Sequence, residues 1–152
     1  MERKRKGRPM KSQEVNLYRE IQKNAETAML AIDTISGKIY DEQLATQVSK
    51  QAVKYSQLRN QALDQMLSVK AEPYHSDRIS EFSLKAGIHY HTLLNTSTSK
   101  LAEVLIKANT DGMVRMNRAL NQKYEGCESA RKLAGELLRL EAGNVDLLKK
   151  YL

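Results

Sequence analysis

A continuous apolar stripe in the last quarter of the chain constrains the fold more than any other feature. Between residues 127 and 152, apolar side chains recur at spacings of three and four, the period of one face of an α-helix. The main row is Ala130, Leu133, Leu137, Leu140, Asn144, Leu147 and Tyr151. A second row beside it is Ala134, Leu138, Glu141, Val145, Leu148 and Leu152. A face this wide has to be buried against other helices, so the stripe predicts a helical bundle.

The same period runs through most of the preceding chain. It predicts helices over about residues 13–35, 41–69, 77–94 and 98–121, before a last helix over about 127–151. The core-facing residues are predicted to be Tyr18, Ile21, Ala25, Ala28, Ile32 and Ile35 in the first helix; Leu44, Val48, Ala52, Tyr55, Leu58, Ala62, Met66 and Val69 in the second; Ile79, Phe82, Ala86, His89 and Leu93 in the third; and Leu101, Leu105, Ala108, Gly112, Met116 and Ala119 in the fourth.

Residues that favour helix caps and turns mark the ends of these helices. Ser12, Asp41, Ser76 or Asp77, and Ser97 or Thr98 each precede a periodic segment. The run 95–99 divides what would otherwise be one helix of roughly 67 Å, either by turning the chain or by kinking it. Because the connectors are short, consecutive helices should pack antiparallel. The expected fold is all-α: an up-and-down antiparallel bundle of four to five helices, formed by residues 13–152.

The composition agrees with a bundle packed from aliphatic side chains. Hydrophobic residues make up 41% of the 152 residues but aromatic residues only 5%, with no tryptophan. A core of Leu, Ile, Val, Ala and Met suits helix packing better than a sandwich of strands, which favours aromatic and β-branched residues.

Two features bear on the compartment. Cys127 is the single cysteine, so no intrachain disulfide can form, and we expect an incidental thiol in a reducing compartment. No apolar run approaches the ~18–20 residues of a membrane span, and no apolar segment follows the charged N-terminus as it does in a signal peptide. We therefore expect a cytoplasmic protein with no membrane partner.

The positive charge of the chain is concentrated at the N-terminus. The net charge is +7, and residues 1–11 supply +5 of it, from six basic residues and one acidic residue. The remaining residues are close to neutral. Residues 1–12 are therefore predicted to be a disordered basic arm, and any attraction to an anionic partner would belong to this arm.

The arm is the candidate nucleic-acid-binding segment, with the predicted contact residues Arg3, Lys4, Arg5, Lys6, Gly7, Arg8, Pro9 and Lys11. Its Lys6-Gly7-Arg8-Pro9 core resembles an AT-hook, in which a Gly-Arg-Pro segment lies in the minor groove of A·T-rich DNA. That resemblance implies groove binding, because glycine permits close approach and arginine meets the negative potential of a narrow groove. Lys6 stands where an AT-hook usually has arginine. A solvated tail that aids solubility is the alternative.

No catalytic or metal motif is evident in the sequence. A di-iron carboxylate bundle needs a Glu-x-x-His on two helices, and none of the predicted helical segments contains one. Glu141 and Asn144 occupy such a spacing, but asparagine is a poor iron ligand. His89 and His91 lie two apart and would point away from each other on a helix. We expect His89 to be a buried core residue, His75 to lie on the surface, and Asn144 to fix the register of the bundle.

Three segments carry a second resemblance: residues 24–34, residues 97–121, and the C-terminal run from Glu141 to Leu152. They are similar to a family of small, uncharacterised bacterial helical-bundle proteins that are ferritin-like in shape. The resemblance covers most of residues 15–152. It implies a bundle and a bacterial source, and it carries no activity and no site residues.

The sequence thus predicts a non-catalytic interaction or structural protein without a cofactor or metal. Its basic arm would contact nucleic acid or another anionic partner, and the bundle is a candidate for self-association. The alternative is a ferritin-like bundle that binds a metal or a small ligand in its core.

Overall fold

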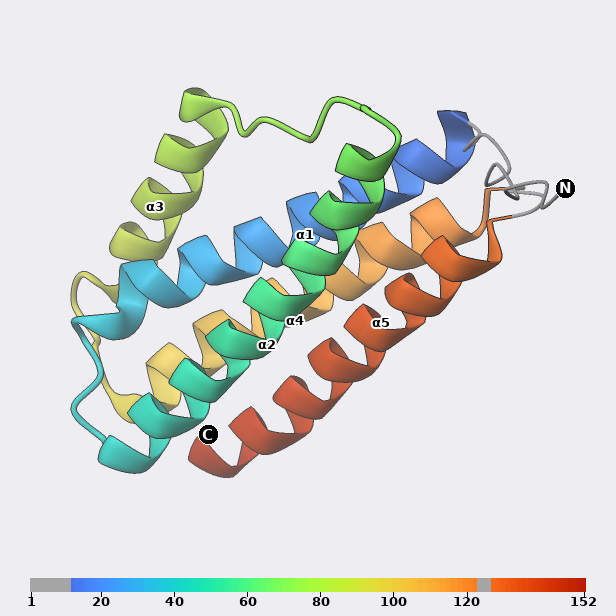
Figure 1. The fold of residues 1–152 in the computed structure, drawn as a ribbon. Helices are drawn as coiled ribbons and strands as arrows, with labels where there is room; N and C mark the ends of the chain where they lie inside the picture. Colours follow the sequence, from blue (N-terminus) through green and yellow to red (C-terminus); the bar gives the residue numbers. More distant parts are fainter. Residues whose placement is uncertain (1–11, 123–126) are drawn as a thin grey trace, which may run out of the picture.

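A computed structural model describes residues 12–122 and 127–152, and the described chain is almost entirely helical (Figure 1). Its elements are α1 (Ser12–Ser36), α2 (Glu42–Ser68), α3 (Arg78–Thr92), α4 (Thr98–Leu120), α5 (Glu128–Leu148) and the short 3₁₀-helix η1 (Lys149–Tyr151). The predicted all-α bundle is confirmed, and the helix ends differ from the predicted ones by no more than about three residues. The basic arm, residues 1–11, lies outside the described residues.

Four long helices form the bundle, and the short helix α3 lies outside it (Figure 1). α1 packs against α2 and α4, and α5 packs against α4 and α2. The connector 69–77 and α3 carry the chain back along the bundle, so α2 and α4 run in the same direction (Figure 1). The segment after α3 turns the chain sharply rather than kinking one long helix, which settles the alternative left open by residues 95–99.

Side-chain caps explain where three of the helices begin. The Asp41 carboxylate accepts a hydrogen bond from the Leu44 amide at 2.8 Å, and Asp77 accepts one from Ile79 at 2.9 Å. Ser97 accepts one from the Lys100 amide at 3.2 Å. Each cap satisfies an amide that has no partner inside its helix. Ser12 differs from its prediction, since it is the first residue of α1.

The core consists mainly of aliphatic residues from α1, α2, α4 and α5, as the composition predicts. Its largest fully buried side chains are Tyr18, Tyr55, Leu17, Ile21, Ile35, Leu44, Met66, Leu101, Leu105, Met116, Leu137 and Leu148. The predicted stripes of these four helices are buried or partly buried, apart from Val69, Leu147 and Leu152 at or near the ends of their segments. None of the helices in the described ranges is long and apolar enough to cross a membrane.

The predicted core face of the third helix is wrong. All five residues of that stripe, Ile79, Phe82, Ala86, His89 and Leu93, are exposed in α3. α3 instead packs through Leu84, Ile88 and Thr92, which lie on a different side of the helix. Both faces are apolar, so periodicity alone could not select the buried one. His89 is consequently a surface residue, and His75 is exposed as predicted.

Candidate functional site

A buried polar cluster in the middle of the bundle joins three helices. The Tyr55 hydroxyl on α2 donates to Asn109 Oδ1 on α4 at 2.6 Å. Asn144 Nδ2 on α5 lies 3.2 Å from Asn109 Oδ1 and 3.3 Å from the Tyr55 oxygen. Asn109 Nδ2 donates to the Leu105 carbonyl at 2.8 Å. All three side chains are buried, so the cluster links α2, α4 and α5 through hydrogen bonds inside the core.

Asn144 occupies the core position that the sequence indicated. It interrupts the leucine-rich stripe of α5, and a buried amide at such a place is costly unless it is hydrogen-bonded. Its partners on α2 and α4 supply those bonds. The predicted role of Asn144 in fixing the register is therefore physically reasonable and stays a prediction.

Glu141 is a buried acid one helical turn before Asn144. It is 1% exposed, and burial raises the pKa of its carboxyl to about 8, with the Arg115 guanidinium acting in the opposite direction. Within the described part of the chain, no group donates a hydrogen bond to Glu141 Oε2. At neutral pH this side chain is therefore mostly protonated.

Gly112 on α4 makes the space that Glu141 occupies. A side chain at residue 112 would overlap Glu141 Oε1. On its other side, the Gly112 carbonyl accepts a hydrogen bond from Asn24 Nδ2 on α1 at 3.1 Å, and Asn24 Oδ1 accepts one from Arg115 Nε at 3.1 Å. Glu141 thus lies beside a polar connection between α1 and α4.

The sequence analysis did not identify Asn24, Asn109 or Gln51 as buried polar residues. Asn109 directly follows Ala108 of the predicted α4 stripe, and this neighbouring position is the only sign in the sequence that its side chain is buried. The Gln51 side chain is 1% exposed, and neither of its amide atoms has a hydrogen-bond partner among the described residues.

The polar cluster offers no metal site in the described ranges. Across residues 12–122 and 127–152, no group of three or more His, Cys, Asp or Glu side chains could hold a metal ion. Asn109, Asn144 and Tyr55 bind one another instead. Cys127 is buried directly before α5.

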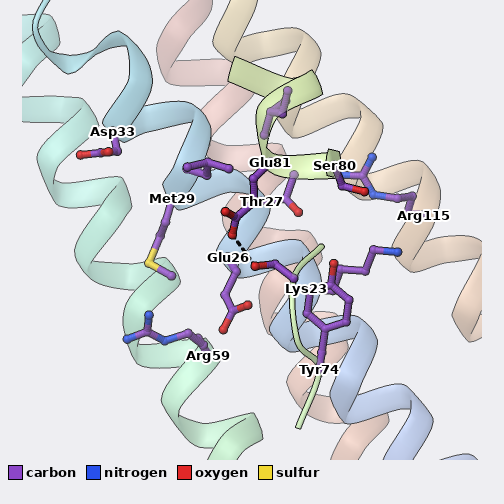
Figure 2. Close-up of a pocket in the computed structure, with 13 residues that line it drawn as sticks. Lys23, Glu26, Thr27, Met29, Asp33, Arg59, Tyr74, Ser80, Glu81 and Arg115 are labelled. Atoms are coloured by element: carbon purple, nitrogen blue, oxygen red, sulfur yellow. Dashed lines mark hydrogen bonds between the residues drawn. The ribbon is translucent and has the colours of Figure 1, made fainter. Parts of the chain in front are cut away.

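A groove of about 700 Å³ is lined by residues of α1, α2, α3, α4 and the connector 69–77 (Figure 2). Three basic and three acidic side chains line it: Lys23, Arg59, Arg115, Glu26, Asp33 and Glu81. The equal numbers of opposite charges give it no preference for the sign of a ligand. Figure 2 shows Tyr74 at the edge of this groove, with Lys23 beside it, and Lys23 Nζ lies 5.5 Å from the centre of the Tyr74 ring.

The connector is held on α1 by two side chains. Gln22 Nε2 donates to the Tyr74 carbonyl at 2.9 Å, and the Tyr74 amide donates to Gln22 Oε1 at 2.8 Å. Arg19 Nε donates to the Glu72 carbonyl at 2.7 Å. At the far end of α3, Lys38 Nζ donates to Thr92 Oγ1 at 2.7 Å. These contacts fasten the connector and the C-terminal end of α3 to α1 and the segment that follows it.

The outward face of α3 is the largest uncovered group of apolar side chains on one described helix. Ile79 and Phe82 are each 74% exposed, and Tyr90 is 78% exposed. Leu93 and Leu94, at the C-terminal end, are 73% and 97% exposed. We call Ile79, Phe82, Ala86, His89, Tyr90, Leu93 and Leu94 the α3 face. Isolated exposed apolar residues are ordinary, whereas large contiguous apolar patches on proteins commonly form contact surfaces.

The candidate nucleic-acid-binding residues cannot be placed relative to this face. Arg3, Lys4, Arg5, Lys6, Gly7, Arg8, Pro9 and Lys11 all lie outside the described residues. Their predicted role therefore rests on the sequence alone.

Comparison with known proteins found no match: no family model, no curated protein and no solved structure is similar to this chain. The likeness to ferritin-like bundle proteins and the AT-hook resemblance therefore both stay predictions. The described fold is an all-α bundle of four long helices, with the short helix α3 packed outside it.

Proposed function

We propose that this chain is a non-catalytic interaction protein that binds a macromolecular partner through the α3 face. One observation carries the proposal: five large apolar side chains on and just after one helix face solvent, although the chain has a complete core elsewhere. Burying such a side chain is worth about 1.5–3 kcal/mol. A partner that covers the face therefore gains binding free energy without reorganising the bundle.

A cross-linking experiment on the intact chain tests this proposal. A photo-reactive phenylalanine analogue replaces Phe82, and a matched variant carries it at Lys132, an exposed position on α5. In cells that express the protein, we expect adducts from position 82 and few or none from position 132. Equal labelling at both positions, or none at position 82, would contradict the proposal.

We further propose that the basic arm contacts nucleic acid. Support comes from the +5 charge of residues 1–11 and from Gly7-Arg8-Pro9. Contacts between basic side chains and phosphates weaken steeply with salt. Intact protein and a variant lacking residues 1–11 should therefore be titrated against A·T-rich and G·C-rich duplexes over a salt series. We expect a salt-dependent affinity that the deletion abolishes, and an A·T preference if the arm enters the minor groove. Equal binding by the two proteins would refute the role of the arm.

A ferritin-like bundle that holds a metal or small ligand is the second candidate. Glu141 favours it, because this buried acid lies against Gly112 between α4 and α5 and its Oε2 has no hydrogen-bond partner among the described residues. The single crossover through α3 is also an arrangement that ferritin-like bundles use (Figure 1). Elemental analysis of the purified protein tests it: stoichiometric iron, manganese or zinc that Glu141→Gln removes would support this candidate, and its absence would count against it. The bacterial cytoplasm is the proposed location for either function.

A further inference from the structure

We propose that the partner on the α3 face is a second copy of this chain, with the two α3 helices packed antiparallel. This inference rests on the proposed function, since it assumes that the α3 face is a contact surface, and it adds the identity of the occupant. Three properties of the face support it: the spacing of its residues, the area that they expose, and their charge.

Exposed residues lie in pairs at equal distances on either side of Ala86: Ile79 and Leu93 are seven residues from it, and Phe82 and Tyr90 are four. Ile79, Phe82, Ala86, His89 and Leu93 follow one another at intervals of three, four, three and four. This is the repeat by which one helix packs along another. Since α3 is the same helix in both copies, an antiparallel pair places Ile79 opposite the partner's Leu93.

The same two-fold symmetry determines the other contacts. Phe82 would face the partner's Tyr90, which allows a ring-to-ring contact. Ala86 would lie on the two-fold axis, opposite the partner's Ala86. A small residue there lets two helices approach closely while the larger residues interlock on either side. A surface that complements itself in this way is what a two-fold dimer requires.

The exposed area is close to what a stable dimer needs. Five large side chains, each about three-quarters exposed or more, would contribute on the order of 600 Å² per copy. A specific interface of standard size buries about 800 Å² per partner. The α3 face is therefore near the size of a standard interface and too small for an obligate one.

The small number of charges on the α3 face also favours a second copy over an acidic partner. The five-residue stripe itself contains no Lys, Arg, Asp or Glu, so most of the contact is neutral. Lys85 directly precedes Ala86, so the two Lys85 side chains would flank the two-fold axis from both copies. Their repulsion is reduced by salt, and the long side chain can turn its ammonium group to water. Salt should therefore strengthen self-association, whereas it would weaken binding to an acidic partner.

Sedimentation equilibrium of the full chain tests the inference. Between about 1 and 500 µM, we expect a reversible monomer–dimer equilibrium whose dissociation constant falls as salt is raised. Phe82→Ser should raise the dissociation constant at least tenfold. Val53→Ser is the matched control, because Val53 is an exposed apolar residue on α2, and it should leave the constant unchanged. Circular dichroism confirms that both variants keep their helix content.

Disulfide trapping tests the orientation. Chains carrying Ile79→Cys are mixed with chains carrying Leu93→Cys under mild oxidation, with wild-type protein as the background control for Cys127. An antiparallel pair predicts mixed 79–93 dimers. Disulfides formed mainly between two Ile79→Cys chains would indicate a parallel pair and would overturn the proposed geometry.

The possible outcomes separate this inference from the proposed function. A chain that stays monomeric at every concentration overturns the second copy as occupant. If the photo-reactive group at residue 82 then links the monomer to a different protein, the α3 face is still an interaction surface. If it links to nothing, both proposals fail.

Discussion

Glu141 on α5 lies against Gly112 on α4 so closely that no side chain could be added at residue 112 without moving the carboxyl group. The contact lies beside the hydrogen bond from Asn24 to the Gly112 carbonyl. The missing side chain at residue 112 therefore lets α5 pack closely on α4 at Glu141. This contact predicts how substitutions of Gly112 and Glu141 change the stability of the bundle.

Gly112→Ala should destabilise the bundle despite the better helix propensity of alanine. Inside a helix, alanine is more favourable than glycine by about 1 kcal/mol of folding free energy. Overpacking a core, however, costs about 1–3 kcal/mol. Chemical denaturation should show a net loss of about 1 kcal/mol. Gly143→Ala is the control, because nothing lies within 4 Å of the position of its added carbon, and it should stabilise the protein. The loss at residue 112 should shrink in a Glu141→Ala background; additive effects would mean that the two residues do not interact.

Because Glu141 is buried, we expect the free energy of unfolding to fall as the pH rises and this carboxyl group loses its proton. Its pKa is about 8 in the folded protein against an ordinary 4.5, so the folded state binds more protons than the unfolded state between these values. The free energy of unfolding should therefore decrease from about pH 5 to about pH 8, by roughly 1 kcal/mol per pH unit or less, and level off above that range.

Glu141→Gln isolates this effect. The glutamine side chain cannot ionise, so the free energy of unfolding of this variant should depend much less on pH. The variant should also be more stable than the wild type at pH 8. Glu136→Gln, a partly exposed position on the same helix, should keep the slope. Parallel pH dependence in the wild type and Glu141→Gln would show that other groups cause it.

Tyr55→Phe should destabilise the bundle by about 1–3 kcal/mol, the typical cost of leaving buried polar groups without a partner. The change removes the 2.6 Å hydrogen bond to Asn109 and the hydroxyl that faces Asn144. Tyr40→Phe is the control, because that ring is 85% exposed. Thermal unfolding of the two variants gives the comparison, and equal midpoints would show that the cluster contributes little.

Gln22→Ala should loosen α3 without unfolding the four-helix bundle. It removes both hydrogen bonds that hold the Tyr74 backbone on α1. Few other contacts hold the connector, so local opening should become easier. Amide hydrogen exchange should accelerate over residues 69–92 and stay unchanged in α5. Unchanged exchange over residues 69–92 would mean that Arg19 and the α3 packing hold the segment without Gln22.

The four bundle helices could be predicted from the sequence because each has a single apolar face. In α2, for example, Leu44, Val48 and Tyr55 share the only apolar side, so burial follows from the helical period. The caps at Asp41, Asp77 and Ser97 depend on local chemistry, which is also readable from the sequence.

The outward turn of α3 could not be predicted in the same way. The helix has apolar residues on two sides, and contacts distant in sequence decide between them: Gln22 with Tyr74, and Lys38 with Thr92. The polar cluster was predicted only in part for a similar reason. Asn144 interrupts an otherwise apolar row, but its partners Tyr55 and Asn109 can be found only once three helices are packed together.

The central claim is that the α3 face binds a second copy of this chain, and concentration-dependent hydrogen exchange tests it most directly. Exchange in the purified full chain should be measured at a few micromolar and at several hundred micromolar. The account predicts that amides of residues 79–93 become more protected at the higher concentration, while those of α2 and α5 do not change. Equal exchange of α3 at both concentrations would contradict self-association through this face.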